Sequence, residues 1–477
     1  MLHRMFVVAA LLTALAGLAC AGGTVEGLPL HVKQLAPGVV RVWVGDQISS
    51  TAVCAVATQK GIVVIDTTDI PKFDQAFRQI IAKELGRSDF KYLINTHGHQ
   101  DHTNGNGVYA DCQIIAHERV VEMMKENQGN FARQITWRTE DIQRQKDQIA
   151  SGKLNAEQKT AAEERIILDT LSIEDAKSAP APTFPTKTFT DKMTLDCGDV
   201  AFELYQAGGT HTKSDIFIFA RQKGILFTGD MMCDKWLTDT PGCLATFAVH
   251  TGEVADYPVL VRHWQALLDR GGEIKLYIPG HWNGELSAAG FRSRFDYLQA
   301  LLADVPAMIQ AGKTFDQMVA EYTLQAKFPQ LVGSPGIGPN GQRISIEHLY
   351  LIHTGKISVG QALWGMIRDE TFAAKFPPLQ ANILKHPDKY FYSEAQLNAM
   401  GYVLLNEQKK SADALQVFEL TRELYPESWN AYDSLAEGVY ATGNKQKAMK
   451  LYQKSVELNP KNENGVKWIA KIESELK

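Results

Sequence analysis

The spacing between apolar residues differs from one part of the chain to the next, which indicates strands in some parts and helices in others. From about residue 29 to 115, short runs rich in β-branched residues stand between turn residues, which is typical of β-strands. The runs are VVRVWVG (39–45), STAVCAVAT (50–58), GIVVIDT (61–67) and KYLIN (91–95). The stretch FDQAFRQIIAKEL (73–85) before the last run is predicted to be helical. A succession of strand, helix and strand predicts an α/β layer.

Strand-like runs return after a long polar interruption. Residues 131–177 are polar and helix-prone, so we expect a helical insertion that either covers a site or forms a solvated arm. A proline-rich linker (178–188) follows. Strands are then predicted at 200–209, 215–220, 224–230 and 274–281, and helices at 257–269 and near 291–312.

The last part of the chain contains an internal repeat. The segments ADALQVFELTRELYP (412–426) and QKAMKLYQKSVELNP (446–460) align at an offset of 34 residues. The alignment pairs Ala414 with Ala448, Phe418 with Tyr452 and Pro426 with Pro460. Paired helices with this period resemble tetratricopeptide repeats. We expect an all-α helical-repeat region at 391–477, with a protein partner as its ligand, and a helical connecting region at 313–390.

The N-terminus has the pattern of a secretory signal peptide. A short basic start precedes the apolar run MFVVAALLTALAGLA, and Ala19-Cys20-Ala21 fits an A-x-A cleavage site. We therefore expect residues 1–21 to be a signal peptide and the mature chain to be periplasmic or secreted. A lipoprotein with Cys20 as the lipidated residue is the alternative. The run is shorter than the roughly 20 residues that span a bilayer, and we expect no transmembrane span.

Composition narrows the class of protein. A chain of 477 residues is too long for one ordinary domain, and its 45% hydrophobic and 22% charged residues suit a globular protein. The net charge of -5 argues against nucleic acid as a partner. The cysteines predict no disulfide framework, because they are few and scattered. After the N-terminal segment they are Cys54, Cys112, Cys197, Cys233 and Cys243.

Candidate metal-binding side chains are most concentrated in the segment INTHGHQDHTNG, residues 94–105. It contains His97, His99, Asp101 and His102, although the chain has only 13 histidines. Neutral imidazole and carboxylate are natural ligands of zinc and similar divalent metals. Two of these histidines, His97 and His99, can face one ion, whereas the adjacent Asp101 and His102 can diverge toward a second.

Three later residues have the same setting. His211 follows an apolar predicted strand, and Asp230 and His281 each end one. Together with the loop they make five histidines and two aspartates, which is enough for two ions with a shared carboxylate.

The motifs THGHQDH, AGGTHTKSD, FTGD and PGH occur in this order and resemble the metallo-β-lactamase superfamily over roughly residues 30–300. The resemblance implies a four-layer αββα sandwich, which we expect at 25–312. It also implies one metal held by His97, His99 and His211 and a second held by Asp101, His102 and His281, with Asp230 bridging. Asp66 matches an acidic position that commonly supports the ligands; a strand-end cap is its alternative role.

The resemblance further implies a dinuclear hydrolase, which the signal-peptide pattern predicts to be exported. The aspartate of FTGD is similar to that of glyoxalase II and lactonases, so we expect an ester, lactone, thioester or lactam substrate. Alkyl sulfatases usually show glutamate near the positions of His211 and Asp230, which argues against sulfate esters. Two divalent ions, expected to be Zn²⁺ with Fe or Mn as alternatives, would make a bridging hydroxide available near neutral pH, and Asp101 would orient it as the catalytic residue.

Three alternatives stay open. They are a β-lactamase-type antibiotic hydrolase, a mononuclear iron enzyme like persulfide dioxygenase, and a protein-binding module whose metal domain is only a scaffold. Candidates for the wall of a small-molecule pocket are His250, Trp236 and Trp282. A homo-oligomer is also left open.

Overall fold

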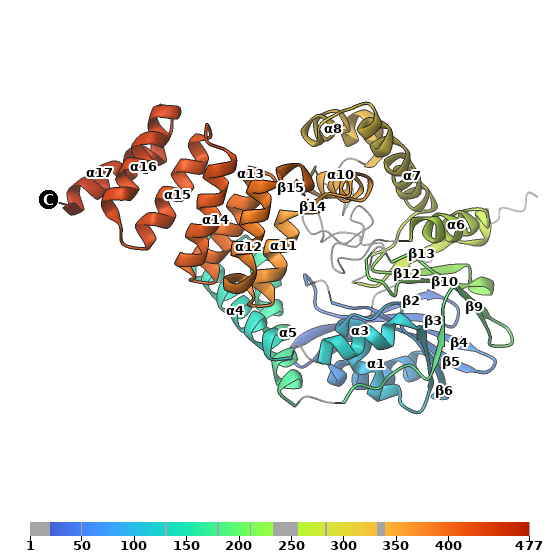
Figure 1. The fold of residues 1–477 in the computed structure, drawn as a ribbon. Helices are drawn as coiled ribbons and strands as arrows, with labels where there is room; N and C mark the ends of the chain where they lie inside the picture. The colour runs from blue at the N-terminus through green and yellow to red at the C-terminus, as the bar shows by residue number, and fades with distance from the viewer. Residues whose placement is uncertain are drawn as a thin grey trace, which may run out of the picture. The chain divides into compact units, whose positions relative to one another are not determined.

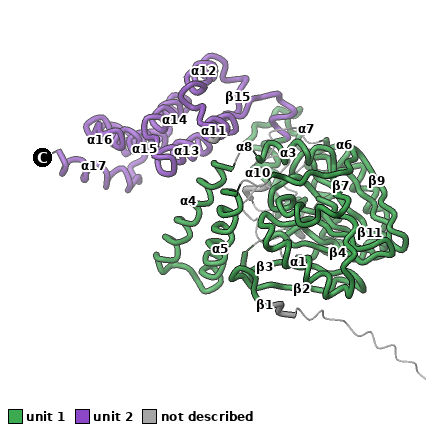
Figure 2. Tube along the Cα trace, turned by 90° about the horizontal axis from the view of Figure 1, so that it is seen from below, with its two compact units in different colours: residues 1–348 green, residues 349–477 purple. Residues whose placement is uncertain are grey.

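The computed structural model describes residues 20–48, 50–128, 131–178, 181–209, 211–231, 256–281, 284–331 and 339–476. The chain divides into two compact units, residues 1–348 and 349–477, which Figure 2 distinguishes by colour. Across the part of the chain that is described, no helix is long and apolar enough to serve as a membrane span. Cys54, Cys112 and Cys197 are free and buried, whereas Cys233 and Cys243 lie outside the described residues.

The larger sheet of the first unit is mixed. Its neighbours are antiparallel from β1 to β5 and parallel from β5 to β8. The strands lie side by side in chain order: β1 (Cys20–Val25), β2 (Leu28–Ala36), β3 (Val39–Val44), β4 (Val53–Thr58), β5 (Gly61–Ile65), β6 (Phe90–Ile94), β7 (Gln113–His117) and β8 (Lys187–Phe189). Parallel neighbours end at the same edge of a sheet, so the segments after β5 and β6 emerge together.

The second sheet is also mixed. Its order is β13 (Leu276–Pro279), β12 (Ile225–Gly229), β11 (Ile216–Ala220), β10 (Ala201–Gln206) and β9 (Lys192–Asp196). The pair β12 and β13 is parallel, and the other neighbours are antiparallel. The ends of β12 and β13 therefore also emerge together.

The two sheets pack face to face through an apolar core. This core contains Val56, Val63 and Ile94 from the larger sheet, and Phe202 and Ile218 from the second. A buried sheet face reads as a run of β-branched and aromatic residues, which explains why these strands could be predicted from sequence.

Helices cover the two outer faces (Figure 1). The helix α1 (Pro71–Leu85) begins with proline and packs Phe73, Phe77 and Ile81 into the core on the outer side of the larger sheet. On the outer side of the second sheet, α6 (Tyr257–Leu268) and α7 (Ala288–Gln310) bring aromatic rings against Phe217. The predicted four-layer αββα sandwich is confirmed.

The polar stretch 131–177 is helical, as predicted, and consists of α4 (Phe131–Ala150) and α5 (Ala156–Ser178). The helices α3 (Arg119–Gln128) and the short α2 (Gln100–Thr103) precede it. We call α4 and α5 the insertion hairpin. Both helices belong to the first unit.

The remaining chain is almost entirely helical. Its elements are α8 (Phe315–Glu321), α9 (Leu324–Lys327), α10 (Pro339–Thr354), β14 (Ile357–Ser358), α11 (Val359–Arg368), α12 (Phe372–Lys385), β15 (Tyr390–Phe391), α13 (Glu394–Tyr402), α14 (Ser411–Leu424), α15 (Trp429–Ala441), α16 (Lys445–Leu458) and α17 (Glu463–Leu476). The helical C-terminal region is confirmed. The predicted domain boundaries stay predictions.

The internal repeat corresponds to two helical hairpins. From α14 to α16 the first residue moves from 411 to 445, and from α15 to α17 it moves from 429 to 463; both offsets are 34 residues. The paired residues Ala414 and Ala448 are fully buried, and so are Phe418 and Tyr452. Small residues that let helices approach and aromatics that fill the space between them explain this pairing. That the hairpins are tetratricopeptide repeats stays a prediction.

Phe418 provides a test of this packing. A Cβ added to Gly401 would lie 2.3 Å from Cε1 of Phe418, whereas a Cβ on Gly365, also helical, would meet nothing within 4 Å. We expect Gly401→Ala to lower the free energy of unfolding by about 1–3 kcal/mol through overpacking. The control Gly365→Ala should raise it by about 0.4–1 kcal/mol, because alanine narrows the unfolded ensemble. Thermal unfolding followed by calorimetry checks both; equal melting temperatures for the two variants would contradict the packing described.

Candidate metal centre

The candidate ligands emerge where the two sheets end at one common edge. The loop 97–102 follows β6, and Asp230 and His281 follow β12 and β13. A backbone hydrogen bond of 3.0 Å from Ile216 N–H to the Thr96 carbonyl joins the two sheets at this edge. Strand ends therefore bring residues that are far apart in the sequence to one place.

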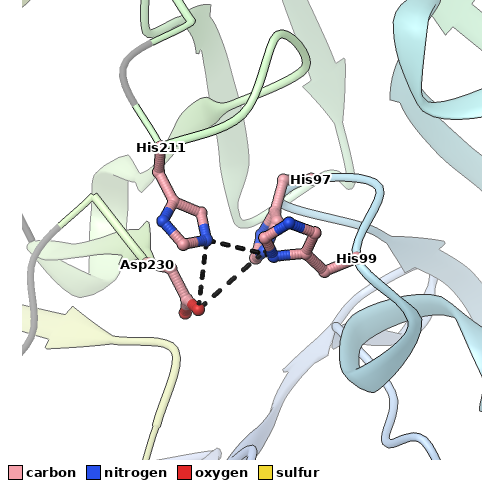
Figure 3. A group of neighbouring side chains, drawn as sticks. All are labelled: His97, His99, His211 and Asp230. Carbon is pink, nitrogen blue, oxygen red and sulfur yellow. Dashed lines mark hydrogen bonds and ion pairs between the residues drawn. The ribbon is translucent and has the colours of Figure 1, made fainter. Parts of the chain in front are cut away.

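Four of these side chains form a first group, His97, His99, His211 and Asp230 (Figure 3). Nδ1 of His99 lies 3.1 Å from Nε2 of His97 and 3.1 Å from Nε2 of His211. Oδ2 of Asp230 lies 3.9 Å from Nε2 of His97 and 3.5 Å from Nε2 of His211. The loop after β6 and the second sheet thus contribute to the same group.

The second group consists of Asp101, His102 and His281. Nε2 of His102 lies 3.3 Å from Nε2 of His281 and 3.6 Å from Oδ2 of Asp101. Asp230 also reaches this group, with Oδ1 3.5 Å from Nε2 of His102 and Oδ2 3.0 Å from Nε2 of His281. The carboxylate of Asp230 therefore lies between the two groups.

These separations suit metal coordination. Ligand atoms bound tetrahedrally at about 2.0–2.1 Å from an ion lie roughly 3.3–3.4 Å from one another. The donor atoms of each group fall around this value and all lie within 4.8 Å of one another. Imidazole nitrogens and carboxylate oxygens are the donors that zinc, iron and manganese share. The two groups could each hold a metal ion.

Asp66 supports the second group from behind. Its carboxylate accepts hydrogen bonds from the Thr96 backbone N–H at 2.7 Å and the Thr96 hydroxyl at 2.8 Å. Its Oδ2 lies 3.0 Å from Nδ1 of His102. A proton held on Nδ1 leaves Nε2 of His102 free to bind a metal. Asp66 has a φ of 61°, a left-handed conformation that is strained for most residues but better tolerated by aspartate.

Glycines permit the close packing at this edge. A Cβ on Gly280 would lie 2.4 Å from Oδ1 of Asp230, and one on Gly229 would lie 2.8 Å from the Thr96 side chain. Gly229 also has a φ of 51°, which glycine adopts without steric cost. The glycine of PGH is therefore required by space, and that of FTGD by space and by backbone conformation.

The electrostatics of the groups differ. Burial lowers the pKa of His97 well below its usual value, which favours the neutral imidazole that binds metal. Burial opposes protonation of His102 as well, but the carboxylates of Asp230, Asp101 and Asp66 prevail and raise its pKa well above the usual value. The three carboxylates around His102 thus concentrate negative charge that a divalent cation would balance.

Arg41 holds the segment that carries His281, and sequence reasoning missed it. This β3 side chain is fully buried. Its guanidinium donates hydrogen bonds to the carbonyls of Gly284 at 2.6 Å, Pro279 at 2.9 Å and His281 at 2.7 Å. A charged residue inside the apolar run VVRVWV was the available signal.

A cavity of about 290 Å³ opens beside the two groups. Its lining includes His99 and Asp101, and on the insertion hairpin Trp137, Arg138 and Arg165. Asp101 is 37% exposed, so its carboxylate is accessible to a molecule in the cavity. Of the two roles left open for the insertion, the structure favours covering the site. The pocket candidates His250, Trp236 and Trp282 lie outside the described residues.

Two mixed sheets lie between layers of helices, and two groups of histidines and aspartates lie at their common edge. This combination is typical of metal-dependent hydrolases with an αββα fold. The family model of the metallo-beta-lactamase superfamily matches residues 43–281, which is half of the chain. The chain belongs to the metallo-beta-lactamase superfamily.

Individual relatives are more distant. A UPF0173 metal-dependent hydrolase from Haloarcula marismortui is 36% identical over 72 residues, which are 14% of this chain and 29% of that protein. The stereoselective inverting sec-alkylsulfatase Pisa1 from Pseudomonas sp. is 14% identical with a TM-score of 0.47, covering 90% of this chain and 65% of that one. A metallo-beta-lactamase from Pontibacter korlensis is 18% identical with a TM-score of 0.36, covering 57% and 99%. The chain thus spans less than two thirds of the first two relatives.

Substitution of Arg41 tests its role. We expect Arg41→Met to lower the free energy of unfolding by roughly 2–5 kcal/mol, because buried carbonyls lose their donors, and to reduce the zinc retained per chain after dialysis. Arg41→Lys keeps the charge and should give a smaller loss. The control Lys33→Met removes a cation that pairs with Glu285 of the same segment but is partly exposed, and should cost under about 1 kcal/mol. Equal stability and zinc content for Arg41→Met and Lys33→Met would refute the positioning role.

Proposed function

We propose that this protein is an exported dinuclear metal-dependent hydrolase that acts on an ester, lactone, thioester or lactam. One observation carries the proposal: the two ligand groups lie side by side and share the carboxylate of Asp230. A site for a single ion would not need the second group.

The first ion would be held by His97, His99 and His211, and the second by Asp101, His102 and His281, with Asp230 contributing to both. When bound, two divalent cations supply an acidified water and stabilise negative charge on the substrate oxygen. Zinc is the first expectation, with iron or manganese as alternatives that the same donor atoms would accept.

Asp101 has the position of a catalytic residue. Its Oδ2 lies 3.4 Å from Nε2 of His281 and 3.4 Å from the Thr51 hydroxyl, which donates a hydrogen bond to it. Its carboxylate also lines the cavity. A carboxylate between a ligand histidine and the cavity can orient an attacking water and accept its proton.

The proposal predicts both metal content and activity. The purified chain should contain close to two zinc, iron or manganese ions, and a panel of chromogenic esters, lactones, thioesters and cephalosporins should include a substrate whose hydrolysis stops with chelator. Asp230→Asn should lower the metal content and reduce kcat/KM by at least about 100-fold, because both ions lose a shared anionic ligand.

The matched control is Asp269→Asn, an exposed aspartate at the end of α6, which should keep wild-type metal content and rates. One iron per chain with no hydrolysis would instead support the persulfide-dioxygenase-like alternative. Turnover of cephalosporins alone would support the β-lactamase-type alternative. Full metal loading with no substrate in the panel, together with a protein captured by residues 391–477, would support the binding-module alternative.

Export has its own test. If residues 1–21 are a signal peptide, the intact mass of the chain recovered from the periplasm or medium should correspond to a chain that begins at Gly22. Replacing Leu11 and Leu12 with arginine should keep the chain unprocessed in the cytoplasm, because an apolar core is needed for recognition. A mature chain that begins at Cys20 and carries added lipid mass would support the lipoprotein alternative, and an uncleaved exported chain would rule out both.

A further inference from the structure

The insertion hairpin forms part of the wall of the cavity beside the candidate ligands. Trp137 and Arg138 come from α4, and Arg165 and Leu168 come from α5. His99 and Asp101 line the same cavity. A substrate that reaches the two groups through this cavity therefore meets the hairpin.

Largely buried polar contacts connect the two helices of the hairpin to each other and to the segment after β5. Arg138 pairs with Asp169 at 2.5 Å and with Asp69 at 3.1 Å, and the Ser172 hydroxyl donates to Asp69 at 2.7 Å. Asp69 follows β5 and lines the cavity. A wall held in this way keeps its shape when a substrate binds.

A second set of contacts secures the loop between β3 and β4. The Glu164 carboxylate of α5 accepts hydrogen bonds from the backbone N–H groups of Asp46 at 2.7 Å, Gln47 at 2.8 Å and Ile48 at 3.0 Å. This loop leads to Ser50 and Thr51, which line the same cavity. These hydrogen bonds therefore connect two parts of the cavity lining, the insertion hairpin and the loop between β3 and β4.

The two arginines of the hairpin that line the cavity, Arg138 and Arg165, are already paired with carboxylates. Arg165 pairs with Asp169 at 3.0 Å and with Asp141 at 3.4 Å, and Arg144 pairs with Asp141 at 2.7 Å. With Arg138, three guanidinium groups thus face three carboxylates, those of Asp69, Asp141 and Asp169. The wall offers no surplus of positive charge to an anionic substituent.

The Trp137 ring is the main apolar surface of this wall. It is 47% exposed, and the guanidinium carbons of Arg138 and Arg165 lie 5.8 Å and 5.6 Å from the ring centroid. The two guanidinium groups limit the motion of the ring, and nearly half of the side chain stays exposed. A large exposed aromatic beside a candidate catalytic centre suits the recognition of a flat or apolar group.

A neighbouring cavity of about 460 Å³ extends this surface. Gln100 and Asn127 line both cavities. The described residues that line the larger one, among them Val108, Met124 and Phe131, include no charged side chain. A longer uncharged substituent therefore has room beyond the first cavity.

We propose that Trp137 is a specificity-determining residue that stacks against an uncharged aromatic or apolar acyl group, so that the substrates are esters, thioesters or lactones with an uncharged aryl or longer alkyl acyl group rather than with an acetyl or anionic one. The inference rests on the proposed hydrolase function. It adds the substrate class and assigns a role to the insertion hairpin.

The test compares Trp137→Ala and Trp137→Phe in the full-length, metal-loaded protein. The substrates are ethyl thioesters of acetate, phenylacetate and 4-carboxyphenylacetate. For wild type, kcat/KM should be highest for the uncharged phenylacetyl thioester. Trp137→Ala should lower it about tenfold, mainly through KM, whereas Trp137→Phe should retain most of it; kcat/KM for the acetyl thioester should fall much less in Trp137→Ala. The control Trp364→Ala removes an equally exposed tryptophan of the second unit and should change nothing.

A binding measurement separates this inference from the proposed function. Phenylacetone and acetone are ketones that resemble the acyl part but cannot be hydrolysed, and their affinities can be measured by NMR titration. Phenylacetone should bind more tightly than acetone to wild type but not to Trp137→Ala. If neither these thioesters nor any ester, lactone or cephalosporin of the panel is hydrolysed while this preference is present, the hydrolase proposal fails and the Trp137 site stands. If thioesters are hydrolysed and Trp137→Ala treats all three as wild type does, the inference is overturned.

Discussion

The first unit depends on holding buried ligand atoms a little over 3 Å apart. Imidazoles and carboxylates brought so close lose their hydration and, among the carboxylates, repel one another. The fold offsets this cost with rigid supports. Strand ends from both sheets fix the backbone, Asp66 sets the proton position on His102, Gly280 leaves space for Asp230, and Arg41 holds the His281 segment. The packing of the two sheets and the positions of the ligand atoms at their common edge therefore depend on each other.

Much of this architecture could be predicted from the sequence, for a physical reason. A strand buried on both faces is an uninterrupted apolar run, so a polar residue at its end is easily noticed. That pattern led to the β6 loop, to Asp230 and to His281. The short strand β8 (Lys187–Phe189) was not predicted, because three residues next to a proline-rich linker form no period.

Other contributions leave no local trace. Arg41 was visible as a charge within VVRVWV, but its partners are backbone carbonyls 238 to 243 residues away, and a carbonyl is present at every position. Trp137 lies on a helix whose composition is polar, so only its placement beside His99 and Asp101 gives it meaning. The division between the two units at residue 348 falls within the region 313–390, where mixed helices and loops give no clear boundary in composition.

The order of the ligands along the chain determines when the centre can form. Four of them belong to the loop 97–102, whereas His281 follows His102 by 179 residues and arrives with β13, the strand that pairs in parallel with β12. Parallel pairing needs a crossover and closes late in folding. A cation held by both groups would therefore meet its full set of ligands only after both sheets of the sandwich have assembled.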